Sequence, residues 1–124
     1  MDELISIIIK AAYNVHNELG AGFLEKVYKN AMLIELHDLG LEAESEIPID
    51  VQYKNNVVGE YYADIIVNDI VVLELKAVEN LDKIHEVQLV NYLQGTGIEI
   101  GLLINFGSSV QVKKKFRTYK KKDM

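Results

Sequence analysis

Apolar residues in the N-terminal part of the chain recur with the spacing of an α-helix. Within residues 2–19 they fall on one stripe, which predicts an amphipathic helix; the stripe comprises Leu4, Ile8, Ala11, Ala12, Val15 and Leu19. Asp2 can cap the start of this helix and Gly20 can end it. A second helix is predicted over residues 24–39, closed by Gly40.

The apolar spacing then shortens to that of β-strands. Residues 47–53 and 57–67 alternate apolar and polar side chains on either side of the turn sequence Lys-Asn-Asn at 54–56. A third strand, residues 70–78, follows Asn-Asp at 68–69. The second and third strands are therefore predicted to form a hairpin.

The last part of the chain returns to a helix followed by strands. Residues 81–93 show a helical pattern that ends near Gly95 and Gly97, and residues 98–106 and 110–116 are predicted strands. The order is two helices, three strands, one helix and two strands. Because a helix after the third strand allows a parallel crossover, this order predicts an α/β fold with a central mixed sheet flanked by helices.

The composition favours one intracellular globular domain. A chain of 124 residues with 49% hydrophobic residues and a single proline is large enough for one core. It has no cysteine, which excludes disulfides and thiolate chemistry. No apolar run reaches the roughly 20 residues that cross a bilayer, and the acidic start MDELISIII makes a poor signal peptide. We therefore expect a cytoplasmic domain over residues 1–124, without membrane contact.

Charge is distributed unevenly along the chain. The formal net charge is −6, but residues 1–112 hold six Lys and Arg against 18 Asp and Glu, a charge of −12. The other cations fall in a predicted basic tail, residues 113–124: Lys113, Lys114, Lys115, Arg117, Lys120, Lys121 and Lys122. An acidic body is poorly suited to tight non-specific nucleic-acid binding, which depends on neutralising phosphates. The tail is either a local nucleic-acid-binding patch or a solvated terminus.

The third predicted strand places charges in the most hydrophobic stretch of the chain, VVLELKA (71–77). Glu74 and Lys76 point to the same face of that strand, and Asp64 lies on the preceding strand. Burying a charge is costly unless it is paired or bound to a metal. Two carboxylates can hold Mg²⁺ and a lysine can offset transition-state charge, as metal-assisted hydrolysis requires. The alternative is a structural ion pair, which the spacing alone favours because such tripeptides are common.

The hairpin loop decides whether Asp64 can reach Glu74. With a two-residue loop, Asp64 would pair with Leu73 and face away from Glu74. An odd-numbered loop, or a bulge in the hairpin, brings both carboxylates to one face. Asn and Asp tolerate left-handed conformations, so we predict a three-residue loop with a bulge.

Two helical stretches carry polar groups that could join this site. Glu25 and Tyr28 are three residues apart near a helix start, where the helix dipole alone favours a carboxylate. His85, Gln88 and Tyr92 form one stripe on the last predicted helix. Ordinary helix packing explains both sets. The functional alternative makes Glu25 a further metal ligand and lets the stripe contact a phosphate or orient the lysine and water.

Taken together, these stretches resemble the GxxExxY protein family, which is similar to the PD-(D/E)XK nuclease superfamily. The matching segments are NELGAGFLEKVY (17–28), YADIIV (62–67), VLELKAV (72–78), HEVQLVNYL (85–93) and GLLINFG (101–107). The family signature stands at Gly22, Glu25 and Tyr28. The resemblance covers about residues 12–116 and implies a restriction-endonuclease-like αβββαβ core.

The superfamily signature falls on Asp64, Glu74 and Lys76, although Ala63 stands where the pattern has proline. The resemblance implies that Lys76 acts on the attacking water or the transition state. The implied metal ligands are the side chains of Asp64, Glu74 and Glu25 and the carbonyl of Leu75. Gln88 and Tyr92 resemble a Q-x-x-x-Y element that supports site and substrate, with Tyr28 and His85 as further supporting residues.

The resemblance implies a Mg²⁺- or Mn²⁺-dependent nuclease that hydrolyses nucleic-acid phosphodiesters, with DNA favoured and RNA left open. The complete acidic set with Lys76 favours activity. One alternative is a non-catalytic nucleic-acid-binding or regulatory module that retains the fold. Another is a structural protein in which Glu74 and Lys76 only form an ion pair. Because the body is acidic, substrate would be reached through the basic tail, a homodimer or a protein partner.

Overall fold

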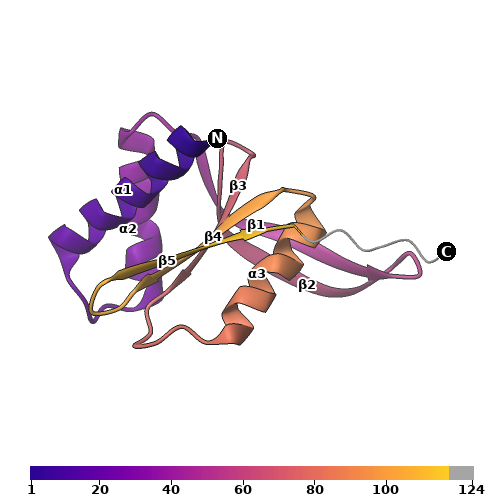
Figure 1. The fold of residues 1–124 in the computed structure, drawn as a ribbon. Helices are drawn as coiled ribbons and strands as arrows, with labels where there is room; N and C mark the ends of the chain where they lie inside the picture. Colours follow the sequence, from indigo (N-terminus) through magenta and orange to yellow (C-terminus); the bar gives the residue numbers. More distant parts are fainter. Residues whose placement is uncertain (118–124) are drawn as a thin grey trace.

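Two helices precede a five-stranded sheet in the computed structural model of the protein, which describes residues 1–117 (Figure 1). The elements are α1 (Asp2–Leu19), α2 (Glu25–Asp38), β1 (Ala43–Tyr53), β2 (Asn56–Val67), β3 (Val71–Lys76), α3 (Lys83–Thr96), β4 (Ile100–Phe106) and β5 (Val110–Phe116). The strands lie in the order β1-β2-β3-β4-β5. All neighbours are antiparallel except β3 and β4, which α3 connects in parallel. The predicted mixed sheet is confirmed.

Two hydrophobic clusters attach the helices to opposite faces of the sheet. Val71, Leu73 and Leu75 of β3 pack in the cluster formed with α1 and α2, whereas Val72 packs in the cluster formed with α3. In Figure 1, α1 and α2 accordingly lie together, apart from α3. The strand is covered on both faces, which explains its nearly continuous apolar sequence. No helix in residues 1–117 has both the length and the apolar character to cross a membrane.

Glycines end α1 and α2 as predicted, whereas the cap predicted at the start of α1 does not form. Gly20 (φ 74°) ends α1, and Gly40 (φ 82°) stands just beyond α2. Both lie in the left-handed region that glycine enters at no steric cost. The prediction that Asp2 caps α1 is wrong, because Asp2 is the first residue of the helix and no side chain caps it. Its carboxylate is still favoured there by the helix dipole.

Several helices and strands begin or end at residues other than those predicted. β1 begins at Ala43 and not at residue 47, because Ala43 pairs with Val67. α3 extends to Thr96, so Gly95 lies inside the helix. A Cβ atom on Gly95 would stand 2.4 Å from Cγ2 of Ile49, so the glycine permits close approach of α3 to β1. β3 and β4 are one or two residues shorter at their predicted ends.

The predicted basic tail begins as a strand. Residues 113–115 belong to β5 and pair with β4, which confirms the strand predicted over residues 110–116; the predicted tail overlaps this strand. Lys115 forms an ion pair with Glu86 of α3 at 3.2 Å, which ties the edge strand to the helix. Arg117 also forms an ion pair, directly after the strand. The lysines at 120–122 lie outside the described residues.

Close contact between α3 and β4 gives the first testable prediction. A Cβ on Gly101 would lie 2.7 Å from Cδ1 of Leu89, a fully buried side chain that would have to shift within the packed core. We expect Gly101→Ala to lower the free energy of unfolding by about 1–3 kcal/mol, measured by urea denaturation. Gly59→Ala is the matched control, because its nearest neighbour is the Tyr61 ring at 3.6 Å. Equal losses in both variants would contradict this packing.

Candidate active site

The hairpin between β2 and β3 brings two acids level with each other. Its last backbone pair joins Val67 and Val71, so the loop contains three residues, 68–70, as predicted. The first two loop residues have left-handed φ values of 52° and 57°. An even number of positions separates Asp64 from Glu74, and this register sets them opposite one another.

β2 and β3 separate after their last backbone pair, and the side chains of the two acids bridge the strands there. The described backbone pairs of β2 and β3 end at Ile65 and Leu73. Asp64 Oδ2 accepts a hydrogen bond from the N–H of Leu75 at 2.8 Å. Glu74 Oε1 accepts one from the N–H of Asp64 at 3.1 Å. Each carboxylate therefore satisfies a backbone amide of the opposite strand where the ladder has ended.

Burial makes this pair of acids electrostatically unusual. Glu74 is 6% exposed, and its burial, followed by the nearby charge of Asp64, raises its pKa to about 8. Burial also raises the pKa of Asp64, against the hydrogen bond from Leu75, which lowers it. Two buried carboxylates in contact do not both ionise readily. At neutral pH the pair retains a proton, and a bound cation could replace it.

Glu25 and Lys76 stand beside the acid pair. Glu25 is the first residue of α2, and its pKa is raised by partial burial while the charge of Lys76 lowers it. Lys76 is the last residue of β3, and its charge also acts on Asp64 and Glu74. Within residues 1–117 the Lys76 ammonium has no hydrogen bond or ion pair. It is therefore available to water or substrate.

The loop before α2 explains two residues of the GxxExxY pattern. Gly22 has a φ of 102°, which a side chain rarely tolerates. Tyr28 is fully buried; its hydroxyl donates to the Gly20 carbonyl at 2.7 Å and accepts from the Phe23 N–H at 3.3 Å. Tyr28 therefore does not share the exposed surroundings of Glu25. It fixes the loop from which α2, and with it Glu25, begins.

The stripe on α3 divides into two functions. Tyr92 is 7% exposed, and burial together with the charges of Glu74 and Asp64 raises its pKa to about 12, which places it beside the acid pair. Nδ1 of His85 accepts a hydrogen bond from the Asp82 N–H at 3.2 Å and so caps the start of α3. The charge of His85 also acts on Glu25. Gln88 lies half-buried between them on the helix.

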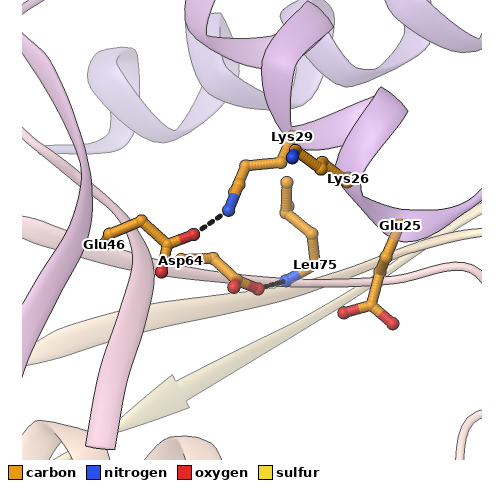
Figure 2. Close-up of a pocket in the computed structure, with 6 residues that line it drawn as sticks. All are labelled: Glu25, Lys26, Lys29, Glu46, Asp64 and Leu75. Carbon is orange, nitrogen blue, oxygen red and sulfur yellow. Dashed lines mark hydrogen bonds and ion pairs between the residues drawn. The ribbon is translucent and has the colours of Figure 1, made fainter.

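A cleft of about 320 Å³ opens between α2 and the sheet (Figure 2). Its lining contains three predicted residues and three that the sequence reasoning missed: Glu25, Asp64 and Leu75, then Lys26, Lys29 and Glu46. The sequence held a signal for Lys29, which stands one helical turn after Glu25. The structure places Glu46 level with Asp64 in the β1–β2 register. Glu46 was overlooked because the predicted strand began at residue 47.

Comparison with known proteins assigns the family. The model of the PD-(D/E)XK nuclease superfamily matches residues 2–119. The chain belongs to this superfamily. Among solved structures, the crystal structure of SSO0001 is similar to the PD-(D/E)XK domain, with a TM-score of 0.59 and 19% sequence identity. The match covers 77% of this chain and 50% of SSO0001, so the chain spans about half that protein's length. No curated protein matches the chain. Membership of the GxxExxY family stays a prediction.

The donor chemistry of this PD-(D/E)XK domain fits a hard divalent cation. Asp64 and Glu74 could supply carboxylate oxygens, and Leu75, which lines the cleft with Asp64, could supply a backbone carbonyl. Within residues 1–117, no three Asp, Glu or His side chains are already close enough to hold a metal ion. The Glu74 carboxylate accepts a hydrogen bond from the Asp64 N–H, whereas the Glu25 carboxylate lies apart from that of Asp64 in Figure 2. A shared ion would require these side chains to turn inward.

The raised pKa of Glu74 predicts how stability varies with pH. Its pKa is 4.5 in the unfolded chain and about 8 when folded, so the folded state binds the extra proton between these values. Stability is therefore lost as the pH rises from about 5 to 8. Glu74→Gln stays neutral and should lose much less stability, as urea denaturation in EDTA at both pH values would measure. Glu44→Gln, an exposed acid of β1, is the control and should follow the wild type. Parallel pH curves for all three proteins would contradict the buried acid pair.

Proposed function

We propose that this PD-(D/E)XK domain is a Mg²⁺- or Mn²⁺-dependent nuclease that hydrolyses phosphodiester bonds, with DNA as the favoured substrate. The observation that carries the proposal is the hydrogen bond between Asp64 and Glu74 beside the Lys76 ammonium, which has no partner among residues 1–117. A buried ion pair would require Lys76 to bond one of the acids. Instead both acids bond backbone amides and repel each other, which favours a cation-binding role over a structural one.

In the proposed mechanism the chain's own groups hold and orient the reactants. Asp64 and Glu74, with the Leu75 carbonyl and Glu25, would hold the metal ion. When bound, a divalent cation polarises a phosphate oxygen and lowers the pKa of a coordinated water. The Lys76 ammonium would position the attacking water and offset the charge that grows on the phosphate oxygens. The oxygen of the attacking water would form a bond to phosphorus while the bond from phosphorus to the ester oxygen breaks, and that oxygen would leave with a proton. The superfamily pattern implies a product with a 5′-phosphate.

The remaining predicted residues support this arrangement in different ways. Tyr92 is buried close enough for the charges of Glu74 and Asp64 to act on it, so it would help to limit access of water to the acid pair. Tyr28 holds the loop that sets the position of Glu25. His85 caps α3 and leaves Nε2 for a contact with substrate, and Gln88 on the same helix would help to orient the substrate.

Nucleic acid is the proposed partner, in a cytoplasmic setting. The lysines of β5 and Arg117 would supply positive charge on the edge strand, although Lys115 and Arg117 already have acidic partners. The proposed contribution of Lys120, Lys121 and Lys122 concerns residues outside the described range. Because residues 1–112 are strongly acidic, a homodimer or a protein partner could add substrate-binding surface.

A non-catalytic nucleic-acid-binding module is the second candidate. The observation in its favour is that residues 1–117 contain no preformed group of three metal-binding side chains. Such a module would bind nucleic acid without requiring Asp64, Glu74 or Lys76. The two candidates therefore differ in how they respond to substitution of these residues.

Calorimetric titration with Mg²⁺ or Mn²⁺ and cleavage assays test the proposal together. We expect Asp64→Asn to lose metal binding, because a carboxylate ligand is removed. Lys76→Ala should keep metal binding but lose at least about a hundredfold in cleavage rate, as for removal of one transition-state donor. Lys10→Ala, an exposed lysine of α1, is the control and should leave both unchanged.

Substrates for this assay are single-stranded, duplex and branched DNA, and RNA. Metal-dependent cleavage of any of them that disappears in both variants supports the nuclease. Binding of nucleic acid without metal binding or cleavage would favour the non-catalytic module. Cleavage retained in Lys76→Ala would remove that residue from the mechanism.

A further inference from the structure

A second cation stands in the cleft beside the proposed metal ligands. The Lys29 side chain extends from α2 towards β1, where it forms an ion pair with Glu46 (Figure 2). Only 17% of the Lys29 side chain is exposed, so its ammonium is held within the cleft. Its charge acts to lower the pKa of both Asp64 and Glu25. Lys29 is therefore part of the electrostatic surroundings of the acids.

Glu46 reaches the cleft through an unfavourable backbone conformation. Its φ of 56° lies in the left-handed region, which is sterically costly for a residue other than glycine. The strand changes faces there: Ala43 packs in the cluster with α1 and α2, whereas Ile47 and Ile49 pack in the cluster with α3. The paired neighbours of Glu46 place it level with Asp64. The backbone thus presents the Glu46 carboxylate to the cleft at this point.

Stability alone does not explain the pairing of Lys29 with Glu46. The Glu46 side chain is 56% exposed, and ion pairs with such solvent access contribute little to folding. Strained non-glycine residues are more often found at binding and switch sites, where they orient a functional group. Here the residue with the left-handed backbone is the ion-pair partner of a lysine inside a cleft that also contains Glu25 and Asp64.

We propose that Lys29 binds a backbone phosphate of nucleic acid adjacent to the phosphate that is cleaved, and that Glu46 holds Lys29 in position until nucleic acid enters. This inference rests on the proposed function and assigns part of its substrate-binding site. Lys29 belongs to the α2 wall and Lys76 to the end of β3, so the two cations would meet different phosphates.

Lys29 could exchange Glu46 for a phosphate group with little rearrangement of the protein. Glu46 is exposed enough to turn into solvent, where its charge is well hydrated. Lysine carries its charge on a flexible stem, so the ammonium can move to a phosphate oxygen without movement of α2. A phosphate offers several strong acceptor oxygens in place of one exposed carboxylate. Lys26 lines the same wall and adds positive charge there.

Binding of a fluorescein-labelled single-stranded oligodeoxynucleotide, followed by fluorescence anisotropy, tests the inference. EDTA is present to prevent metal-dependent cleavage, and affinity is measured over a series of salt concentrations. Lys29→Met should weaken binding about tenfold and reduce the salt slope by about 0.7, as for loss of one phosphate contact on a single strand. Lys29→Arg should retain both.

Glu46→Gln should have the opposite effect and tighten binding several-fold, because it releases Lys29. That gain should vanish in the Lys29→Met/Glu46→Gln double variant, since the released cation is no longer present. The matched controls, Lys10→Met on α1 and Glu44→Gln on β1, change the same charges at exposed positions outside the cleft lining. Neither control should alter the affinity beyond a small shift.

Each outcome decides the inference separately from the nuclease proposal. Wild-type affinity in Lys29→Met, weaker binding in Glu46→Gln, or a gain that persists in the double variant would overturn it, as would failure of the wild type to bind the oligonucleotide. If circular dichroism shows that Lys29→Met is unfolded, the Glu46→Gln variant decides: tighter oligonucleotide binding supports the inference, and unchanged binding overturns it. Mg²⁺ titration of Lys29→Met should still show binding, and the cleavage assay judges the nuclease proposal independently.

Discussion

Two hydrogen bonds across the parting ends of β2 and β3 determine the geometry of the whole site: Glu74 accepts one from the Asp64 N–H, and Asp64 accepts one from the Leu75 N–H. Each acid replaces a backbone partner that the sheet no longer provides, so neither can be exchanged for an apolar residue without leaving an amide unpaired. The same contact forces two carboxylates together in a buried place, where they ionise reluctantly. The backbone thus orients a pair of oxygen donors whose mutual repulsion a cation would relieve.

The elements around this contact bring further charges to it. α2 begins at a loop that Gly22 and Tyr28 fix, and its first turns carry Glu25 and Lys29 into the cleft. On the other side, β1 presents Glu46 through a left-handed backbone position. The cleft is lined by both acids and lysines, a combination suited to a metal ion and a phosphate chain entering together.

The sequence predicts the centre of the site better than its edges. The even separation of Asp64 and Glu74, with Asn-Asp in the loop, was sufficient to predict the register, because strand periodicity is local and strict. Glu46 escaped prediction because no rule on residue type anticipates a glutamate with positive φ inside a strand. Residues 113–116 were predicted as part of a strand and, from their charge, also as part of a basic tail; backbone pairing with β4 shows that the strand prediction was right. The cap formed by His85 was missed for a related reason, since Glu or Gln is usual at that position.

The proposed nuclease activity requires one divalent cation to bind between Asp64 and Glu74. Crystals of the wild-type protein soaked in Mn²⁺, with data collected at the manganese absorption edge, locate such an ion by its anomalous signal. The account predicts one strong peak whose coordination shell contains both carboxylates and the Leu75 carbonyl. A map with no peak there, or with manganese bound only at other acidic side chains, would contradict it.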